Sequence, residues 1–195
     1  MKYRFNKISA VFLIFLLLVT NTTKCKAAEY KINFVGDLSN KAVVNSAETY
    51  ASMVPQNILK AMHNQNIRCR ICNSISKESG TILDENSVYG LYVTYYTYEA
   101  PGDRFIYLKN DYNGSEALIH EIGHFVDQYQ GNLSNADEWR ILYEKYGAKV
   151  TGYSGTNKME GFAETFSTTI LYPETVKNIS EDLYQYMKNV IGTVQ

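Results

Sequence analysis

The run His120-Glu121-Ile122-Gly123-His124 constrains the fold of this 195-residue chain more than any other feature of its sequence. Histidines four residues apart lie on the same face of a helix, so both imidazoles can reach one metal ion. Glu121 is offset from His120 by about 100° around that helix, where its carboxylate can take a proton from a zinc-bound water. We therefore expect a helix over residues 115–130, capped by Ser115, with a packed side formed by Leu118, Ile122, Phe125, Val126 and Tyr129.

A third protein ligand has to come from elsewhere in the sequence, because catalytic zinc sites hold three protein ligands and a water. The metzincin pattern does not apply, since Asp127 stands in place of its glycine and Gln130 in place of its last histidine. Glu160 and Glu164 are four residues apart on one face of a predicted helix. One of them can bind zinc while the other accepts the N–H of a ligating histidine, and the spacing leaves the two roles open. His63, the remaining histidine, is expected at the surface.

The sequence around these glutamates resembles a known group of metallopeptidases. Tyr153 stands seven residues before Glu160, and Phe162-Ala163-Glu164-Thr165-Phe166 follows it. Together with the 120–124 motif, this pattern resembles the gluzincins, specifically the catalytic domain of anthrax lethal factor and the small secreted Pro-Pro endopeptidases of Gram-positive bacteria. The resemblance implies that Glu160 is the third zinc ligand and that Glu164 is the hydrogen-bond partner of His120. It also implies that the Tyr153 hydroxyl assists at the oxyanion or at the leaving group.

The function implied by this resemblance is hydrolysis of peptide bonds in protein substrates by a zinc metalloendopeptidase with one Zn²⁺ per chain. Glu121 would act as general base and pass the proton on to the departing amine. An extended substrate is expected to add as a strand beside one of the two strands predicted between Val88 and Leu108, and the protein is expected to be a monomer. The alternative is a catalytically weak relative acting as a binding module, or a secreted effector resembling a toxin domain, although no zinc-site residue is missing.

The first residues of the chain have the pattern of a secretory signal peptide. Three basic residues precede an apolar run over residues 8–19, which is too short to span a bilayer comfortably. Small residues at Cys25 and Ala27 fit cleavage after Ala27. Lys24 disfavours a lipoprotein cut before Cys25, and the short run disfavours an uncleaved anchor. We therefore expect a signal peptide over residues 1–27, a catalytic domain over residues 28–195, secretion to the extracellular space and no stable membrane anchor.

The charge balance argues against a nucleic-acid partner. Residues 1–27 hold five of the 19 basic residues and none of the 20 acidic residues. The expected mature chain therefore has 14 basic and 20 acidic residues, a net charge of −6 with the histidines neutral. Nucleic-acid binding depends on Lys and Arg side chains that neutralise phosphates, so no nucleic-acid partner is expected.

The expected mature chain contains two cysteines, Cys69 and Cys72. A structural four-cysteine zinc site is excluded, because no second pair accompanies them. Residues 67–71 alternate between apolar and basic side chains, as a strand does. Residues three apart in a strand face opposite sides, so a Cys69–Cys72 disulfide would need a break in the strand. Two ordinary, partly buried thiols are expected, and a disulfide or a redox pair is the alternative.

The order of the predicted elements indicates an α+β fold, in which a small mixed sheet is followed by a mostly helical half. The fold is expected to be zincin-like, with the active-site helix carrying the 120–124 motif. Strands are expected at residues 30–35, 67–71, 88–98 and 104–108. Helices are expected at residues 38–64 with an interruption at Pro55, and at 115–130, 136–146, 158–172 and 174–191. Turns or loops are predicted at residues 77–86, 100–103, 110–114 and 151–157.

Overall fold

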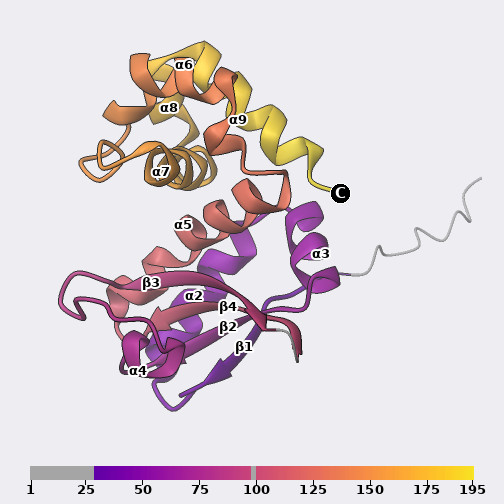
Figure 1. The fold of residues 1–195 in the computed structure, drawn as a ribbon, viewed down its shortest axis with the longest axis vertical. Coiled ribbons are helices and arrows are strands. Elements are labelled where there is room, and N and C mark those ends of the chain that lie inside the picture. Colours follow the sequence, from indigo (N-terminus) through magenta and orange to yellow (C-terminus); the bar gives the residue numbers. More distant parts are fainter. Residues whose placement is uncertain (1–28, 98–99) are drawn as a thin grey trace, which may run out of the picture.

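The sheet in this computed structural model has four strands and forms the lower part of the molecule as drawn in Figure 1. The structure describes residues 29–97 and 100–195, so the predicted signal peptide and its cleavage site lie outside the described residues. The strand order is β1-β2-β4-β3, with β1, β2 and β4 parallel and β3 antiparallel to β4. The predicted mixed sheet is confirmed, with strands β1 (Asn33–Gly36), β2 (Ile67–Cys72), β3 (Gly90–Thr97) and β4 (Ala100–Lys109).

Helices cover both faces of this sheet and form the second half of the molecule (Figure 1). One face packs against α2 (Lys41–Met53), α3 (Gln56–Asn64) and α5 (Tyr112–Tyr129), and the other against the short α4 (Ile75–Ser79). The helical half contains α6 (Asp137–Lys145), α7 (Lys158–Leu171), α8 (Pro173–Ile179), α9 (Glu181–Thr193) and 3-10 turns at Leu133–Asn135 and Gly147–Lys149. Helix α5 lies between the two halves and packs on both, which confirms the predicted α+β arrangement. Among the described residues, no helix is long and apolar enough to cross a membrane.

The two faces of the sheet contribute to separate cores, and the two cysteines lie on opposite faces. Cys69 and Ile71 belong to the large core beneath α2, α3 and α5. Cys72 and Phe105 belong to the small core beneath α4. Both thiols are free, as predicted, but both residues are fully and not partly buried. Burial raises the pKa of each thiol, that of Cys72 to about 11.

The prediction of a turn at residues 100–103 was wrong, because β4 already begins at Ala100. This part of β4 pairs with the end of β3 through Thr97 opposite Ala100 and Tyr96 opposite Pro101. Strand β2 meets β4 only from Arg104 onward, so Pro101 stands where β4 has a neighbour on one side only. Proline is tolerated at such a sheet edge, because no ladder partner requires its missing N–H there.

The prediction of a loop over residues 77–86 was wrong at its start, where α4 continues to Ser79. The Ser74 side chain accepts a hydrogen bond from the Lys77 backbone N–H and caps this short helix. Gly80 has a left-handed backbone conformation, with φ of 69°, and ends it. Helix α4 is therefore defined by its two capping residues. It is too short to show the apolar periodicity by which longer helices can be predicted from sequence.

Helix α5 begins one turn earlier than predicted, at Tyr112. Its cap is Asp111 and not Ser115, since the Asp111 carboxylate accepts the Gly114 N–H at 2.8 Å. Aspartate caps a helix as well as serine does, so cap preference alone does not favour Ser115 over Asp111. Ser115 is buried instead, and its hydroxyl donates to the Tyr112 carbonyl at 2.7 Å. The predicted end of the helix is confirmed, because α5 ends at Tyr129.

The predicted helix over residues 174–191 is in fact two helices, α8 and α9. They are separated at Ser180, which has an extended backbone and caps α9 by accepting the Leu183 N–H. Pro173 follows the end of α7 and forms the first turn of α8. Pro55 similarly separates α2 from α3, although it stands at the N-cap of α3 and not within its first turn.

Candidate metal centre

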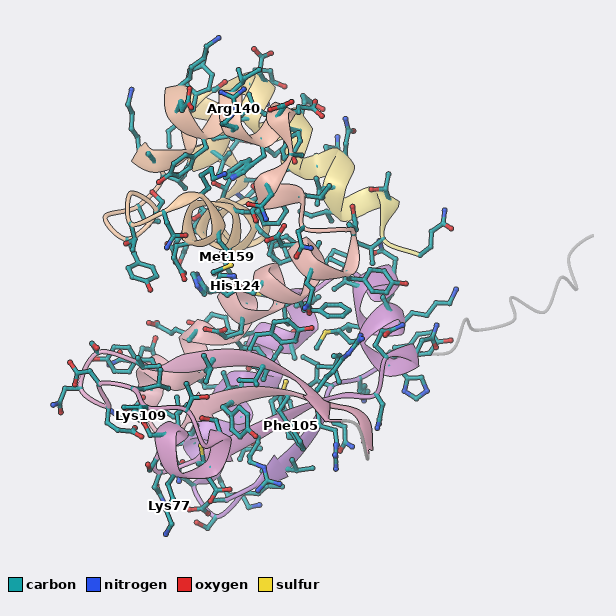
Figure 2. The ribbon with its side chains drawn as sticks, in the orientation of Figure 1. Lys77, Phe105, Lys109, His124, Arg140 and Met159 are labelled. Carbon is teal, nitrogen blue, oxygen red and sulfur yellow. The ribbon has the colours of Figure 1, made fainter. Side chains whose placement is uncertain are left out.

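Three side chains from two helices converge between the sheet and the helical half. His120 and His124 lie one turn apart on α5, with ring centroids 4.7 Å apart, and Glu160 lies in the first turn of α7. Glu160 Oε2 is 3.1 Å from His120 Nε2 and 3.3 Å from His124 Nε2. One ligand atom of each residue lies within 4.8 Å of the other two. Figure 2 shows His124 in this central region with Met159, the neighbour of Glu160 in the chain, close by.

This donor set fits zinc. Two imidazole nitrogens and one carboxylate are the ligands of one common class of catalytic zinc site. Zinc–ligand bonds of about 2.0–2.2 Å place the ligand atoms roughly 3.3–3.6 Å apart around a tetrahedral ion, close to the separations of Glu160 Oε2 from the two histidine nitrogens. The side chains of His120, His124 and Glu160 are only 12%, 14% and 15% exposed. Among the described residues, these three form the one group of histidine, cysteine or carboxylate side chains with this spacing.

The electrostatics of the triad are those of a cation site. Burial alone would lower the pKa of His120, but hydrogen bonds to Glu160 and Glu164 outweigh burial and raise this pKa to about 10. Burial would raise the pKa of Glu160, but the two imidazoles outweigh it and hold this pKa at about 2. An ionised carboxylate is therefore kept between two imidazoles, and a divalent metal that displaces the shared proton satisfies all three groups.

Glu164 holds the far side of the His120 ring. Its Oε1 lies 2.7 Å from His120 Nδ1, so the Nε2 of the same ring faces Glu160. The Thr151 hydroxyl also interacts with the Glu164 carboxylate and, together with His120, lowers the pKa of Glu164. Such a contact on the second ring nitrogen sets the tautomer and the ring orientation of a ligating histidine.

Glu121 projects from α5 toward the sheet. Its side chain is buried, with only 5% of the residue exposed, and it lies against β3. The backbone N–H of Tyr92 in β3 donates a hydrogen bond to its carboxylate. Burial raises the pKa of Glu121, and the nearby imidazoles and the Tyr92 N–H oppose this change. A carboxylate with a raised pKa beside a candidate metal site is suited to proton transfer.

Local hydrogen bonds place Glu160 and Tyr153 next to the histidines. The Asn157 side chain caps α7 by accepting the backbone N–H groups of Met159 at 2.9 Å and Glu160 at 3.0 Å. In the loop before it, the Thr151 hydroxyl accepts the backbone N–H of Tyr153 at 3.2 Å. The Tyr153 ring is 5.9 Å from the His120 ring, and the residue is 53% exposed.

All six residues predicted for the site line a single cleft of about 940 Å³: His120, Glu121, His124, Tyr153, Glu160 and Glu164. One wall of the cleft is β3 with the segment before it, from Ser87 to Tyr92. The opposite wall comes from the loop carrying Tyr153 and from α7. Helix α5 forms the base, so the candidate metal site faces an open channel beside the edge of the sheet.

Two comparisons with known proteins relate the chain to metallopeptidases and agree with this fold. The chain is 38% identical to lethal factor of Bacillus anthracis over 68 residues, a match that covers 30% of this chain and 8% of lethal factor. Its structure is similar to that of the Pro-Pro endopeptidase of Paenibacillus alvei, with a TM-score of 0.62 and 21% identity, covering 80% of this chain and 96% of the other. The predicted resemblance is confirmed. No family model matches the chain.

The structural likeness supports the zincin-like fold. The contacts within the site add two residues that were not predicted from the sequence. Thr151 contacts Glu164 and Tyr153 together, and the Tyr92 backbone contacts Glu121. The sequence gives a weak indication for Thr151, because a threonine hydroxyl in a loop often accepts a hydrogen bond from a backbone N–H two residues later, here that of Tyr153. No sequence pattern indicates the contact between Tyr92 and Glu121. This contact uses the backbone of β3, and the position of β3 relative to α5 depends on the tertiary fold.

Proposed function

We propose that this chain is a secreted zinc-dependent endopeptidase that hydrolyses peptide bonds in protein substrates. The observation that carries the proposal is the convergence of His120, His124 and Glu160 with Glu121 in one cleft. Lethal factor and the Pro-Pro endopeptidase, to which the chain is similar, support a peptidase activity. The matched segment spans only 8% of lethal factor, so the activity and the substrates of that protein do not transfer directly.

His120, His124 and Glu160 are the proposed ligands of one zinc ion per chain. Zinc held there would polarise the scissile carbonyl and lower the pKa of a water molecule. Glu121 would take the proton of that water and pass it to the departing amine, because it projects into the cleft beside both histidines. Glu164 would keep the Nδ1 proton of His120 and so direct the lone pair of Nε2 toward the metal.

Tyr153 would stabilise the oxyanion that develops on the scissile carbonyl. Its ring lies beside His120 on the rim of the cleft, and more than half of the residue is open to solvent. Burial raises the pKa of Tyr153, and the carboxylates of the site raise it further, so the hydroxyl keeps its proton at neutral pH. A protonated hydroxyl can donate a hydrogen bond to an oxyanion.

The substrate would bind as an extended strand along β3. Tyr89 and Lys109 form a hydrogen-bonded pair, since the Lys109 N–H donates to the Tyr89 carbonyl at 2.9 Å. In an antiparallel ladder such pairs alternate, so the backbone groups of Gly90 and the carbonyl of Tyr92 point away from β4 toward the open edge, where the Tyr92 N–H already donates to Glu121. This edge borders the cleft, and a peptide paired with it would pass directly over the candidate metal site.

The domain organisation and the location of the protein are also part of the proposal. Residues 1–27 would be a signal peptide and residues 28–195 the catalytic domain of an extracellular monomer. The basic residues and the short apolar run at the start of the sequence support this assignment. The net negative charge expected for the mature chain supports a protein substrate over nucleic acid.

Metal content and peptidase activity of the purified protein test the proposal together. We expect about one zinc per chain and cleavage of a peptide library that a chelator abolishes and added zinc restores. Glu121→Ala should keep the zinc and lose nearly all turnover, because it removes the base and leaves all three ligands. Full activity of the metal-free protein would refute the metal mechanism. Zinc binding without detectable cleavage would favour the binding-module or effector alternative.

A further inference from the structure

Gly90 in β3 lies unusually close to the proposed general base. A Cβ atom built on Gly90 would be 2.7 Å from Glu121 Oε1, 2.8 Å from Glu121 Cγ and 3.0 Å from the Cβ of Ala117. Cβ atoms in proteins essentially never lie this close to another heavy atom, so any residue larger than glycine would have to displace Glu121. The φ of Gly90 is not in the left-handed region, so the backbone conformation does not explain why glycine stands here.

The contact lies at the point where α5 crosses the edge strand. Side chains of Gly90 and Tyr92 would share one face of β3, and the Tyr92 side chain packs toward α5, with its ring 6.1 Å from that of Phe125. The position of the absent Gly90 side chain is therefore taken by the Glu121 side chain. Two residues along the same strand, the Tyr92 N–H donates to the Glu121 carboxylate.

We propose that Gly90 is a positioning residue for Glu121, an inference that rests on the proposed peptidase function. Its missing side chain gives Glu121 the space to lie against β3, where the Tyr92 N–H fixes the carboxylate. The strand edge that would pair with the substrate backbone is the same edge that holds the base. The distance between base and scissile bond is therefore set within one strand and does not depend on the exposed loops around the cleft.

The first experiment measures kcat, KM and zinc content of Gly90→Ala. The added methyl group points toward α5 and not toward the open strand edge, so substrate pairing and KM should stay within about twofold. The displaced carboxylate should lower kcat by about 10²-fold, the effect expected from a misplacement of about 1 Å. Zinc content should be unchanged, because no ligand is touched. Gly192→Ala is the matched control: Gly192 lies in α9, a Cβ there meets no atom within 4 Å, and kcat should not change.

The second experiment measures thermal stability and requires no activity. Gly90→Ala should lower the Tm by several degrees, as overpacking does. In the Glu121→Ala background the same change should cost much less, because the two closest atoms are gone and only the Ala117 contact remains. If Gly90→Ala alone does not fold, folding of the double variant supports the proposal and failure of both overturns it.

Three further results would overturn the role of Gly90. These are an unchanged kcat, loss of zinc from Gly90→Ala, or an equal loss of Tm in the wild-type and Glu121→Ala backgrounds. Loss of zinc would mean that Gly90 supports the ligand helix as a whole. A protein with no zinc-dependent cleavage would refute the proposed function, yet the stability experiment would still decide whether Gly90 makes room for Glu121.

Discussion

Helix α5 and the segment from Thr151 to Glu160 hold their site residues by different means. On α5, the site residues lie in the middle of an 18-residue helix that is packed between the sheet and α7. The contact with α7 is so close that a Cβ on Gly123 would lie 2.9 Å from the Ala163 Cα. The segment 151–160 is instead a largely exposed loop followed by a helix start, held by the hydrogen bonds of Thr151 and Asn157.

This difference separates the tasks of the two regions. Packing over a long buried helix fixes the two histidines and Glu121 relative to the fold, so changes in exposed loops should hardly move them. The third ligand and Tyr153 depend on a few local hydrogen bonds, each of which contributes only about 0.5–1.5 kcal/mol. Substitutions in α5 should therefore affect folding, whereas substitutions in the segment 151–160 should mainly alter metal affinity and turnover.

The largest effect is expected from Glu160→Ala, which removes the proposed third ligand. The variant should fold and lose its zinc, because two histidines alone do not complete a catalytic zinc site. Glu164→Ala should only weaken zinc binding, by roughly 10–100-fold, as the loss of a contact to a ligating histidine does. Metal analysis of both variants after dialysis measures this, with the exposed Glu174→Ala as a charge-matched control. Zinc retained by Glu160→Ala and lost by Glu164→Ala would exchange the two roles.

Tyr153→Phe should have the next largest effect. It keeps the ring beside His120 and removes only the hydroxyl, so zinc content and KM should change little. Turnover should fall by roughly 10²–10³-fold, as it does when one oxyanion donor is lost. Tyr172→Phe, an exposed tyrosine at the end of α7 that does not line the cleft, serves as the control for kcat. An unchanged kcat for Tyr153→Phe would mean that Tyr153 only packs against the rim of the cleft.

The sequence predicted α5 well and the fine structure of the sheet less well. The periodicity of apolar residues and the 120–124 motif both require a helix, so its existence and its C-terminal end were predictable. The extra turn at its start depended on Asp111 competing with Ser115 as the cap, and both are suitable caps. The extension of β4 to Ala100 depended on which strands neighbour each part of it, and Pro101 by itself favours a turn.

The members of the candidate site were predictable from spacing and resemblance, but several of their supports were not. His120, His124, Glu160 and Glu164 could be proposed because helical spacing places such pairs on one face. Gly90 could not, because its importance comes from the approach of α5 to β3, which no local pattern encodes. The same reason explains why Tyr92 was missed, since its contribution is a backbone N–H.

Gly123→Ala tests how tightly α5 packs against α7, and the measured quantity is the free energy of unfolding. Alanine in a helix is favoured over glycine by about 1 kcal/mol, so an unhindered position would gain stability from this change. At Gly123 the new Cβ would meet the α7 backbone at 2.9 Å, and overpacking costs about 1–3 kcal/mol. We expect a net loss in the free energy of unfolding measured by urea denaturation, whereas Gly192→Ala should show none. A gain at Gly123 would mean that α5 and α7 can separate without cost.

Asn157→Ala tests the segment 151–160, which is held by local hydrogen bonds, and should have the smallest effect on stability. Loss of an N-cap costs typically about 1 kcal/mol, and this cap also holds the backbone N–H of Glu160. The first turn of α7 should therefore fray, and zinc affinity should fall severalfold although no ligand has changed. Ser180→Ala is the matched control, because it removes the cap of α9 at a similar cost in stability and lies outside the cleft. Isothermal titration of the metal-free variants with zinc distinguishes the two. If both variants bind zinc as tightly as the wild type, Glu160 is held by tertiary packing, as the histidines are, and the difference between the two regions disappears.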